Sequence, residues 1–313
     1  MRVLLTGGSG MVGQAMRRIA PTLTPDIELL APTRAELPLQ DRYLVADWFA
    51  DNPIDAVIHI AARVGGIQAN IDHPVDFLIE NLRMNDAVIH GAHDAGVERL
   101  IYLGSSCMYP RDYRQPLREE DVLAAPLEPT NEGYALAKIA GAKLCEYISS
   151  SFDARYYRAF IPCNLFGMGD HFATAGSHLM AAIVTKIVDA RDANEDEVEI
   201  WGSGDARREF IYTDDLVSFL LESLPKLETY PPLMNLGHDT DHSVKEYYQM
   251  AAEVAGYQGR FTHDLTRPEG MMHKCMTSER ANAFGWRPKT DMREALARTI
   301  KAYEAQKRGD ISA

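Results

Sequence analysis

A tyrosine and a lysine stand four residues apart in Tyr134-Ala-Leu-Ala-Lys138. This spacing places both side chains on one face of a helix, so we expect the ammonium group to lower the pKa of the phenol. A partly ionised phenol can exchange a proton with an alcohol or a carbonyl while a hydride moves at the same carbon. The pair therefore indicates redox chemistry at a carbonyl carbon.

A serine and a cysteine follow a predicted strand in the segment 103–109. Side chains alternate along an extended strand, so Ser105 and Cys107 are predicted to point the same way. Ser105 can donate a hydrogen bond to a carbonyl oxygen beside Tyr134, and a Cys107 thiolate can remove a proton from the neighbouring carbon. A buried, unreactive thiol is the other interpretation of Cys107, and the spacing alone does not decide between them.

A glycine-rich loop begins at Thr6, between the first predicted strand and the first helix. Its Gly7, Gly10 and Gly13 have the spacing of a dinucleotide-binding loop: the first permits a tight turn, the second a close approach of pyrophosphate, and the third close packing of helix on strand. We expect Met11 and Val12 to contact the cofactor as well. The loop predicts a nicotinamide dinucleotide site at the start of the chain.

The second predicted strand ends in Ala31-Pro32-Thr33-Arg34, where an NAD-binding site usually has an acidic residue. Arg34 stands there instead, and a guanidinium group can pair with the 2′-phosphate of NADP. NADP is therefore favoured over NAD, although Arg34 also fits an ordinary surface cation.

The elements that must position these residues alternate between short apolar runs and helical patterns. This alternation is typical of an α/β fold with a doubly wound parallel sheet and a smaller C-terminal α/β lobe. Strands are predicted at residues 3–6, 27–31, 56–60, 100–104, 156–161 and 233–236, and helices at 11–21, 42–51, 75–95, 134–150 and 214–224. We predict a dinucleotide-binding domain at 1–163 plus about 209–238, and a smaller lobe that caps the sheet at about 164–208 plus 239–313.

Composition narrows the class of protein. The 313 residues include 32 Lys and Arg against 45 Asp and Glu, and this net charge of −13 argues against nucleic acid or an anionic membrane as a partner. The first residues lack the pattern of a signal peptide, and no apolar run is long enough for a membrane helix, so we expect a cytoplasmic enzyme. The four scattered cysteines predict neither a disulfide framework nor a metal site.

Several motifs together resemble the extended short-chain dehydrogenase/reductases, and within them the GDP-L-fucose synthase type of epimerase/reductase. The likeness covers most of the chain and rests on the segments 61–67, 104–110, 128–132, 134–141, 177–178, 201–204 and 208–210. The resemblance implies NADP(H) as cofactor and GDP-4-keto-6-deoxy-mannose as substrate. It also implies epimerisation at C3 and C5, then reduction of the C4 ketone.

The resemblance assigns separate roles to the reactive side chains. Cys107 is expected to take the ring proton, His178 to return one to the opposite face, and Tyr134 to protonate the oxygen during reduction, with Ser105 and Lys138 assisting. Asn164 and Leu165 are expected beside the nicotinamide. The remaining expected cofactor contacts are Ala61, Ala62, Leu103, Gly104, Ser106, Lys138, Pro162 and His178, and the expected substrate contacts are Lys186, Trp201, Arg208, Glu269 and Lys274.

One segment departs from the family pattern. Between Gly270 and Lys274 the family usually has a small residue, a proline and an arginine, whereas this chain has Met271, Met272 and His273. The departure lies in the substrate lobe, so it bears on the sugar rather than on the type of reaction.

Four alternatives follow. The same chemistry fits a GDP-4-keto-3,6-dideoxyhexose epimerised at one carbon, as in GDP-L-colitose synthesis, and it fits a GDP-heptose. A 4-epimerase or dehydratase of the same fold is a more distant candidate, and a non-catalytic cofactor sensor or scaffold is the most distant.

The helices at 75–95 and 134–150 are expected to form a two-helix seam between the subunits of a homodimer.

Overall fold

The computed structural model describes residues 1–172, 177–267 and 270–310. Its centre is a six-stranded sheet of order β10-β5-β4-β3-β1-β2, in which all five pairings are parallel. The strands are β1 (Arg2–Thr6), β2 (Glu28–Leu30), β3 (Ala56–His59), β4 (Arg99–Leu103), β5 (Tyr156–Pro162) and β10 (Leu233–Leu236). The doubly wound parallel sheet predicted from the sequence is confirmed.

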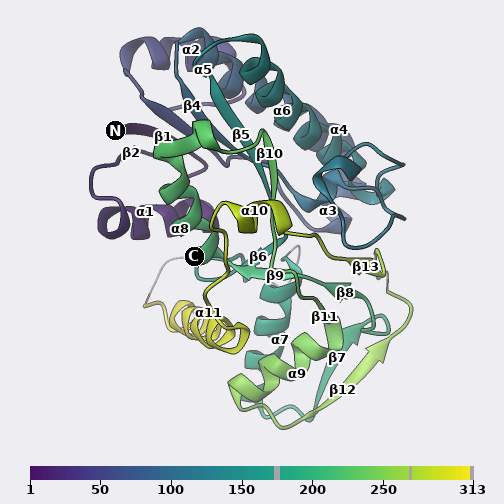
Figure 1. The fold of residues 1–313 in the computed structure, drawn as a ribbon. Helices are drawn as coiled ribbons and strands as arrows, with labels where there is room; N and C mark the ends of the chain where they lie inside the picture. The colour runs from purple at the N-terminus through teal and green to yellow at the C-terminus, as the bar shows by residue number, and fades with distance from the viewer. Residues whose placement is uncertain (173–176, 268–269, 311–313) are drawn as a thin grey trace.

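Helices cover both faces of this sheet (Figure 1). One face carries α1 (Met11–Leu23) and α8 (Thr213–Ser223), and the other carries α2 (Arg42–Asp51), α4 (Pro74–Asn85), α5 (Gly91–Asp94) and α6 (Glu132–Ser151). A π-helical turn, Asp86–His90, joins α4 to α5 with helical backbone angles at both junctions, so the helix expected at 75–95 is present and contains one wider turn. Because both faces are buried, the central strands are continuously apolar rather than alternating.

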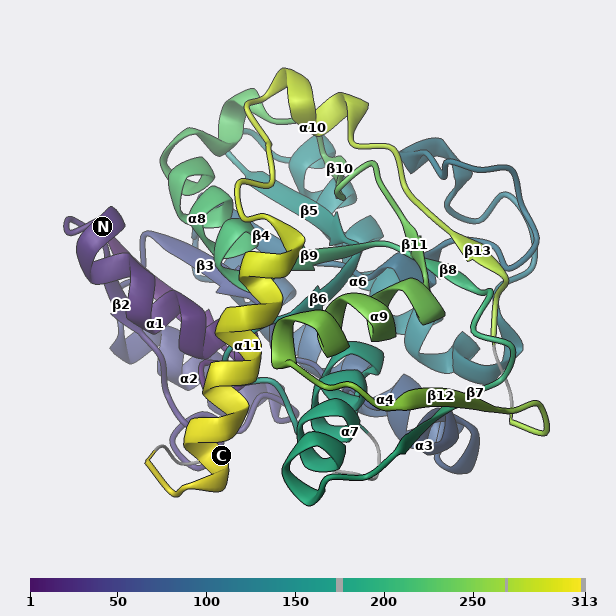
Figure 2. The same cartoon turned by 90° about the horizontal axis from the view of Figure 1, so that it is seen from below.

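A smaller lobe lies below the sheet, and Figure 2 shows its three long helices from beneath. They are α7 (Leu179–Ala193), α9 (Val244–Ala255) and α11 (Met292–Lys307). Short strand pairs complete the lobe: β7 (Glu197–Trp201) with β12 (Arg260–Asp264), β6 (Asn164–Phe166) with β9 (Phe210–Tyr212), and β8 (Arg207–Arg208) with β11 (His242–Ser243) and β13 (His273–Lys274). The shorter helices are α3 (Ile67–Asp72) and α10 (Glu279–Ala283).

Helix α9 is absent from the sequence prediction, although the sequence marks both of its ends. Ser243 and Glu246 form a reciprocal capping box at its start, and Gly256 ends it with a φ of 77°. A serine followed three residues later by a glutamate is a recognised helix-start pattern, and a left-handed glycine is a common helix end.

Two hydrophobic clusters form the core. One lies around the six-stranded sheet and the other lies among α7, α9 and α11. The predicted domain division remains a prediction. Met276, Ala281 and Trp286, which that division places in the lobe, pack in the cluster around the sheet.

The strand order places a ligand-binding crevice at a definite edge. Strand β1 is followed in the chain by β2, its neighbour on one side, and β3 is followed by β4 on the opposite side, so the loops that leave the carboxyl ends of β1 and β3 diverge. Ligands of doubly wound sheets bind at such a point.

Among the described residues, no helix is both long and apolar enough to cross a membrane.

Candidate active site

Helix α6 brings Tyr134 and Lys138 to the carboxyl end of β4. Lys138 is 3% exposed, and its Nζ donates a hydrogen bond of 2.7 Å to the carbonyl oxygen of Leu103. The ammonium nitrogen also lies 4.9 Å from the ring centroid of Tyr102 and 5.9 Å from that of Tyr134. Burial lowers the pKa of Lys138 to about 7.

The phenol of Tyr134 behaves differently from the sequence expectation. Burial raises its pKa, the nearby Cys107 raises it further, and a hydrogen bond with Ser105 only partly offsets them. The predicted lowering of this pKa is therefore wrong for this structure, because loss of hydration is the largest influence on the phenol. A protonated phenol suits a proton donor, which is the role that ketone reduction requires.

A buried histidine, His59, lies close enough to Lys138 for the two groups to interact electrostatically. His59 is fully buried at the end of β3, and its Nδ1 lies 2.7 Å from Oγ1 of Thr6. Burial lowers the pKa of His59 to about 3, and the charge of Lys138 adds to the effect. Asn85 donates a hydrogen bond of 2.8 Å to the carbonyl oxygen of Ala137, one residue before Lys138. A neutral His59 leaves Lys138 without a competing cation at this position.

Ser105 and Cys107 are not part of an extended strand. Strand β4 ends at Leu103, and Ser105 caps the 3-10 turn Ser106–Met108 by accepting a hydrogen bond of 3.3 Å from the backbone N–H of Cys107. The argument from period-two alternation is therefore wrong. The turn nevertheless keeps both side chains near Tyr134, since both affect its pKa.

The thiol of Cys107 lies between two polar side chains. Asn131 Nδ2 is 3.3 Å from its Sγ, and Lys274 Nζ is 4.0 Å from the same sulfur atom. Burial lowers the pKa of Lys274, and the adjacent Cys107 opposes that change. An amide donor and an ammonium group therefore both lie within contact distance of this sulfur atom.

His178 stands immediately before α7, as its N-cap residue. Its Nδ1 lies 3.8 Å from Oδ1 of Asp170, a carboxylate that is nearly buried. Asp170 raises the pKa of His178, and partial burial of the ring opposes it. Asp170 thus favours the protonated form of His178, which is the form that an acid needs. Within the described residues, no hydrogen bond, ion pair or ring contact joins His178 to Cys107 or Tyr134.

The glycine loop has the geometry of an anion-binding turn. Gly7 has a φ of 77°, and a Cβ at this position would lie 2.9 Å from the backbone of Ala61. Gly10 precedes α1, whose first turn has neither a side-chain cap nor an acidic residue. Met11 and Val12 begin the helix, so its N-terminal N–H groups and dipole are available to a phosphate.

Arg34 lies exposed in the turn after β2. The nearby acid, Glu36, folds back and accepts a hydrogen bond of 2.7 Å from the backbone N–H of Thr33. A second cation, Arg17 of α1, approaches Gly8 on the same side as Ala31. The region after β2 therefore has Arg34 and, from α1, Arg17, whereas the carboxylate of Glu36 is occupied by a backbone N–H group.

The other predicted cofactor residues follow the ends of their strands. Ala61 and Ala62 follow β3, and Leu103, Gly104 and Ser106 follow or end β4. Pro162 ends β5, whereas Asn164 and Leu165 begin β6, where Asn164 Nδ2 donates to the carbonyl oxygen of Glu209 at 2.9 Å. Their roles in binding stay predictions.

The predicted substrate residues form two groups. Lys186 lies 5.1 Å from the ring of Trp201, which is about half exposed, and both side chains also bond Glu199. Arg208 neighbours Lys274 and lowers its pKa, so these two cations belong with Cys107. Glu269 lies outside the described residues.

Comparisons with known proteins identify the family. The model of the NAD dependent epimerase/dehydratase family matches residues 3–237. The chain belongs to this family. It is 40% identical over 310 residues to a GDP-L-colitose synthase of Yersinia pseudotuberculosis, covering 99% of this chain and 100% of that protein. It is 39% identical to a GDP-L-fucose synthase of Escherichia coli (strain K12), with 96% of each chain covered.

A solved relative supports the same placement. The GDP-mannoheptose C4 reductase from Campylobacter jejuni with NADP bound superimposes with a TM-score of 0.88 and 26% identity, over 97% of this chain and 98% of that chain. The family match ends at Gly237, just after β10. The matched part therefore contains the whole six-stranded sheet with Tyr134 and Lys138, whereas Lys274 lies beyond it.

Sequence reasoning missed several neighbours of the predicted site. Asn131 approaches the sulfur of Cys107, Asp170 pairs with His178, and Arg267 lies 4.8 Å from the ring of Trp201. Asn81 bonds the backbone of Arg63 and so fixes the loop after Ala62. Only Asn131 had a usable signal, because it lies in the motif 128–132 one helical turn before Tyr134.

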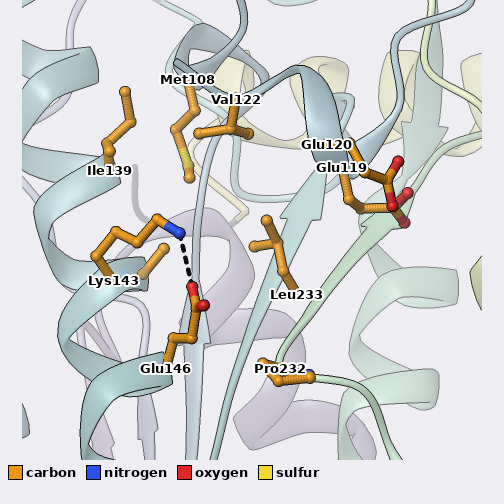
Figure 3. A pocket seen from close by; sticks show the side chains of 10 residues that line it. Met108, Glu119, Glu120, Val122, Ile139, Lys143, Glu146, Pro232 and Leu233 are labelled. Atoms are coloured by element: carbon orange, nitrogen blue, oxygen red, sulfur yellow. Dashed lines mark hydrogen bonds and ion pairs between the residues drawn. The ribbon is translucent and has the colours of Figure 1, made fainter. Parts of the chain in front are cut away.

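A cavity of about 130 Å³ lies beside α6, near the start of β10. Figure 3 shows Met108, Val122 and Leu233 lining it, with the ion pair between Lys143 and Glu146 at its edge. None of the predicted site residues lines this cavity, so it is separate from the candidate active site.

Proposed function

We propose that this chain is an NADPH-dependent epimerase/reductase that converts GDP-4-keto-6-deoxy-D-mannose to GDP-L-fucose. The observation that carries the proposal is the position of the Cys107 sulfur atom, which lies near both Asn131 and Lys274. Cys107 is also close enough to Tyr134 to affect the pKa of its phenol, as Ser105 does. A base and a proton donor are thereby next to each other. This combination suits proton removal beside a ketone followed by reduction of that ketone.

The epimerisation half uses Cys107 and His178. The Cys107 thiolate takes the proton from the ring carbon next to the C4 ketone, and the ketone oxygen accepts the resulting negative charge. The imidazolium of His178, maintained by Asp170, then returns a proton to the opposite face of that carbon. No electrons leave the sugar in this half, and each epimerised carbon loses one proton and gains one.

The reduction half uses Tyr134, Ser105 and Lys138. Bound NADPH supplies the hydride that arrives at C4. Ser105 holds the carbonyl oxygen, and the protonated phenol of Tyr134 delivers its proton to that oxygen as the alcohol forms. Lys138, anchored on Leu103, provides the positive charge that stabilises the phenolate left behind.

The residues of the glycine loop fit NADP(H). The left-handed Gly7 and the uncapped start of α1 would hold the pyrophosphate, and the exposed Arg34 with Arg17 would face the 2′-phosphate. Lys186, Trp201 and Arg208 would hold the GDP-sugar, together with Glu269 from the sequence prediction.

A second substrate has a specific observation in its favour. His273, which departs from the family pattern, pairs closely with Asp241, and Asp241 also pairs with Arg207 at 2.7 Å. This arrangement adjoins the predicted substrate residues Arg208 and Lys274. The alternative substrate is a GDP-4-keto-3,6-dideoxyhexose epimerised at C5 alone, and the similarity to a GDP-L-colitose synthase supports it. A GDP-heptose is the third.

The deciding experiment is NADPH oxidation with GDP-4-keto-6-deoxy-mannose in heavy water, followed by location of the deuterium in the product. Deuterium at both C3 and C5 is expected. Deuterium at C5 alone would transfer the assignment to single-carbon epimerisation, and absence of turnover would require the dideoxy and heptose substrates to be tested in the same way.

We further propose a homodimer formed through α4 and α6, which lie side by side (Figure 1). Val75 and Ile79 on α4, and Leu136 and Tyr147 on α6, are exposed apolar side chains that a partner's helices would cover. Sedimentation of the wild type and of Leu136→Arg tests this, with a shift to monomer expected in the variant. A cytoplasmic location is part of the same proposal.

A further inference from the structure

Residues 270–278 form a strap that runs from the lobe to the sheet, past β13 and toward α10 (Figure 1). Its backbone is held at several points: Arg207 N–H donates to the carbonyl oxygen of Met272 at 2.8 Å, and Leu117 exchanges hydrogen bonds with Cys275 and Thr277 at 2.8 and 2.9 Å. The strap carries Lys274, so these bonds determine where the ammonium group lies.

Glu209 is a buried carboxylate beneath the strap. It is 1% exposed, between β8 and β9, and its Oε1 accepts hydrogen bonds from the backbone N–H groups of His238 and Asp239, the latter at 2.8 Å. Its Oε2 accepts from the backbone N–H of Met276 at 3.1 Å. Gly237 packs so closely that a Cβ there would overlap the carboxylate. Glu209 thus joins the end of β10 to the strap.

Gln115 holds the same strap on either side of Lys274. Its Oε1 accepts a hydrogen bond of 2.9 Å from the backbone N–H of Cys275, and its Nε2 donates to the carbonyl oxygen of His273 at 3.4 Å. Glu209 fixes the backbone two residues further along. Between these anchors the side chain of Lys274 reaches to 4.0 Å from Cys107 Sγ.

We infer that Glu209 is a positioning residue for the ring-proton transfer: it holds Met276, and through the strap it keeps Lys274 beside Cys107. The inference rests on the proposed function, because it assigns Glu209 to the epimerisation half alone. The carboxylate of Glu209 reaches the strap through Met276 and takes no part in the contacts of Tyr134, Ser105 or Lys138 described above.

The substitution Glu209→Gln keeps the size and shape of the side chain and changes the hydrogen bonds that it can accept. Three N–H donors converge on two oxygens, which a carboxylate satisfies and a carboxamide does not. With its one oxygen toward His238 and Asp239, the glutamine turns its NH₂ group toward the N–H of Met276. Two donors then face each other, and the strap loses its bond at Met276.

The test compares two rates in each variant. One is ring-proton exchange of the keto sugar in heavy water, and the other is NADPH formation from GDP-L-fucose and NADP, which reports hydride transfer without prior epimerisation. In Glu209→Gln we expect exchange to fall about tenfold or more and hydride transfer to change less than about twofold. Asp215→Asn changes a carboxylate away from the strap, which accepts from the backbone N–H groups of Lys289 and Thr290 at 3.0 and 2.9 Å, and should leave the ratio of the two rates unchanged.

Lys274→Met shows whether Glu209 acts through Lys274. In that background Glu209→Gln should cause no further loss of exchange, since the group that it positions is already absent. An equal fall of both rates in Glu209→Gln, or a further multiplied loss in the double variant, would overturn the inference.

The outcomes for the inference and for the proposed function are distinguishable. A wild type without either rate would refute the proposed function, whereas an active wild type with an unaffected Glu209→Gln would refute only the inference. If Glu209→Gln does not fold, Glu209→Asp is measured identically. It keeps the charge but withdraws the oxygens by one methylene group, and the same selective loss of exchange is expected.

Discussion

The two halves of the candidate site are built differently. Tyr134 and Lys138 share one helix, and Lys138 is buried and bonded to the last residue of β4. Cys107, His178 and Lys274 come from a 3-10 turn, a helix start and the strap, in three separate parts of the chain. The reduction half therefore depends on the rigid sheet, whereas the epimerisation half depends on how three segments meet.

The largest expected effect breaks the reduction half alone. Tyr134→Phe removes the proton donor and keeps the ring, so NADPH oxidation should fall about 10³-fold, within the usual range for loss of general acid catalysis. Ring-proton exchange in heavy water should persist. Unchanged NADPH oxidation would show that the phenol is not the donor.

Cys107→Ser is the corresponding change in the epimerisation half. A hydroxyl is a far weaker base than a thiolate at neutral pH, so exchange should slow about 10²-fold. NADPH formation from GDP-L-fucose and NADP should remain. Rapid exchange in this variant would identify Cys107 as a packing residue.

Arg34→Ala tests whether Arg34 contacts the 2′-phosphate of the cofactor that the reduction half uses. Loss of a charge-assisted contact should weaken NADPH binding roughly 10- to 100-fold and leave NADH binding unchanged. Arg18 of α1, which pairs with Asp214 at 2.6 Å, is the control arginine, and Arg18→Ala should leave the binding of both cofactors unchanged. Equal losses for NADPH and NADH would exclude a 2′-phosphate contact for Arg34.

The smallest expected effect is a shift in the pH dependence of ring-proton exchange in Asp170→Asn, which tests the epimerisation half alone. Asp170 raises the pKa of His178, so His178 stays protonated to a higher pH and its acid function is lost only as pH rises through that raised value. In Asp170→Asn the pKa falls, and the high-pH limb of the exchange rate should move to lower pH. At a pH on that limb the loss should be up to about tenfold. An unmoved limb would separate Asp170 from the acid.

The same contrast explains what the sequence could predict. The strands, α1, α2 and α6 follow from apolar runs and helical spacing, and the Tyr134 and Lys138 pair follows from one spacing within one helix. Asp170, Gln115 and Arg267 are ordinary polar residues until the fold brings them to His178, Lys274 and Trp201. The effect of burial on Tyr134 was also unpredictable, because the loss of hydration is a property of the surrounding layers.

Local rules failed where a capping interaction replaced a regular element. The alternation expected for Ser105 and Cys107 assumed that β4 continued, whereas the hydroxyl of Ser105 ends it by accepting the N–H of Cys107. A serine that bonds its own backbone two residues ahead competes with the strand ladder.

The position of β10 at the edge of the sheet affects the order in which the chain can fold during synthesis. After β5 ends at Pro162 the chain builds α7 and β7 in the lobe before it returns as Leu233–Leu236 to pair with β5. Until that segment has left the ribosome, β5 presents an open edge with unpaired N–H and carbonyl groups. We therefore expect nascent chains that end before β10 to be the species that depends most on chaperones.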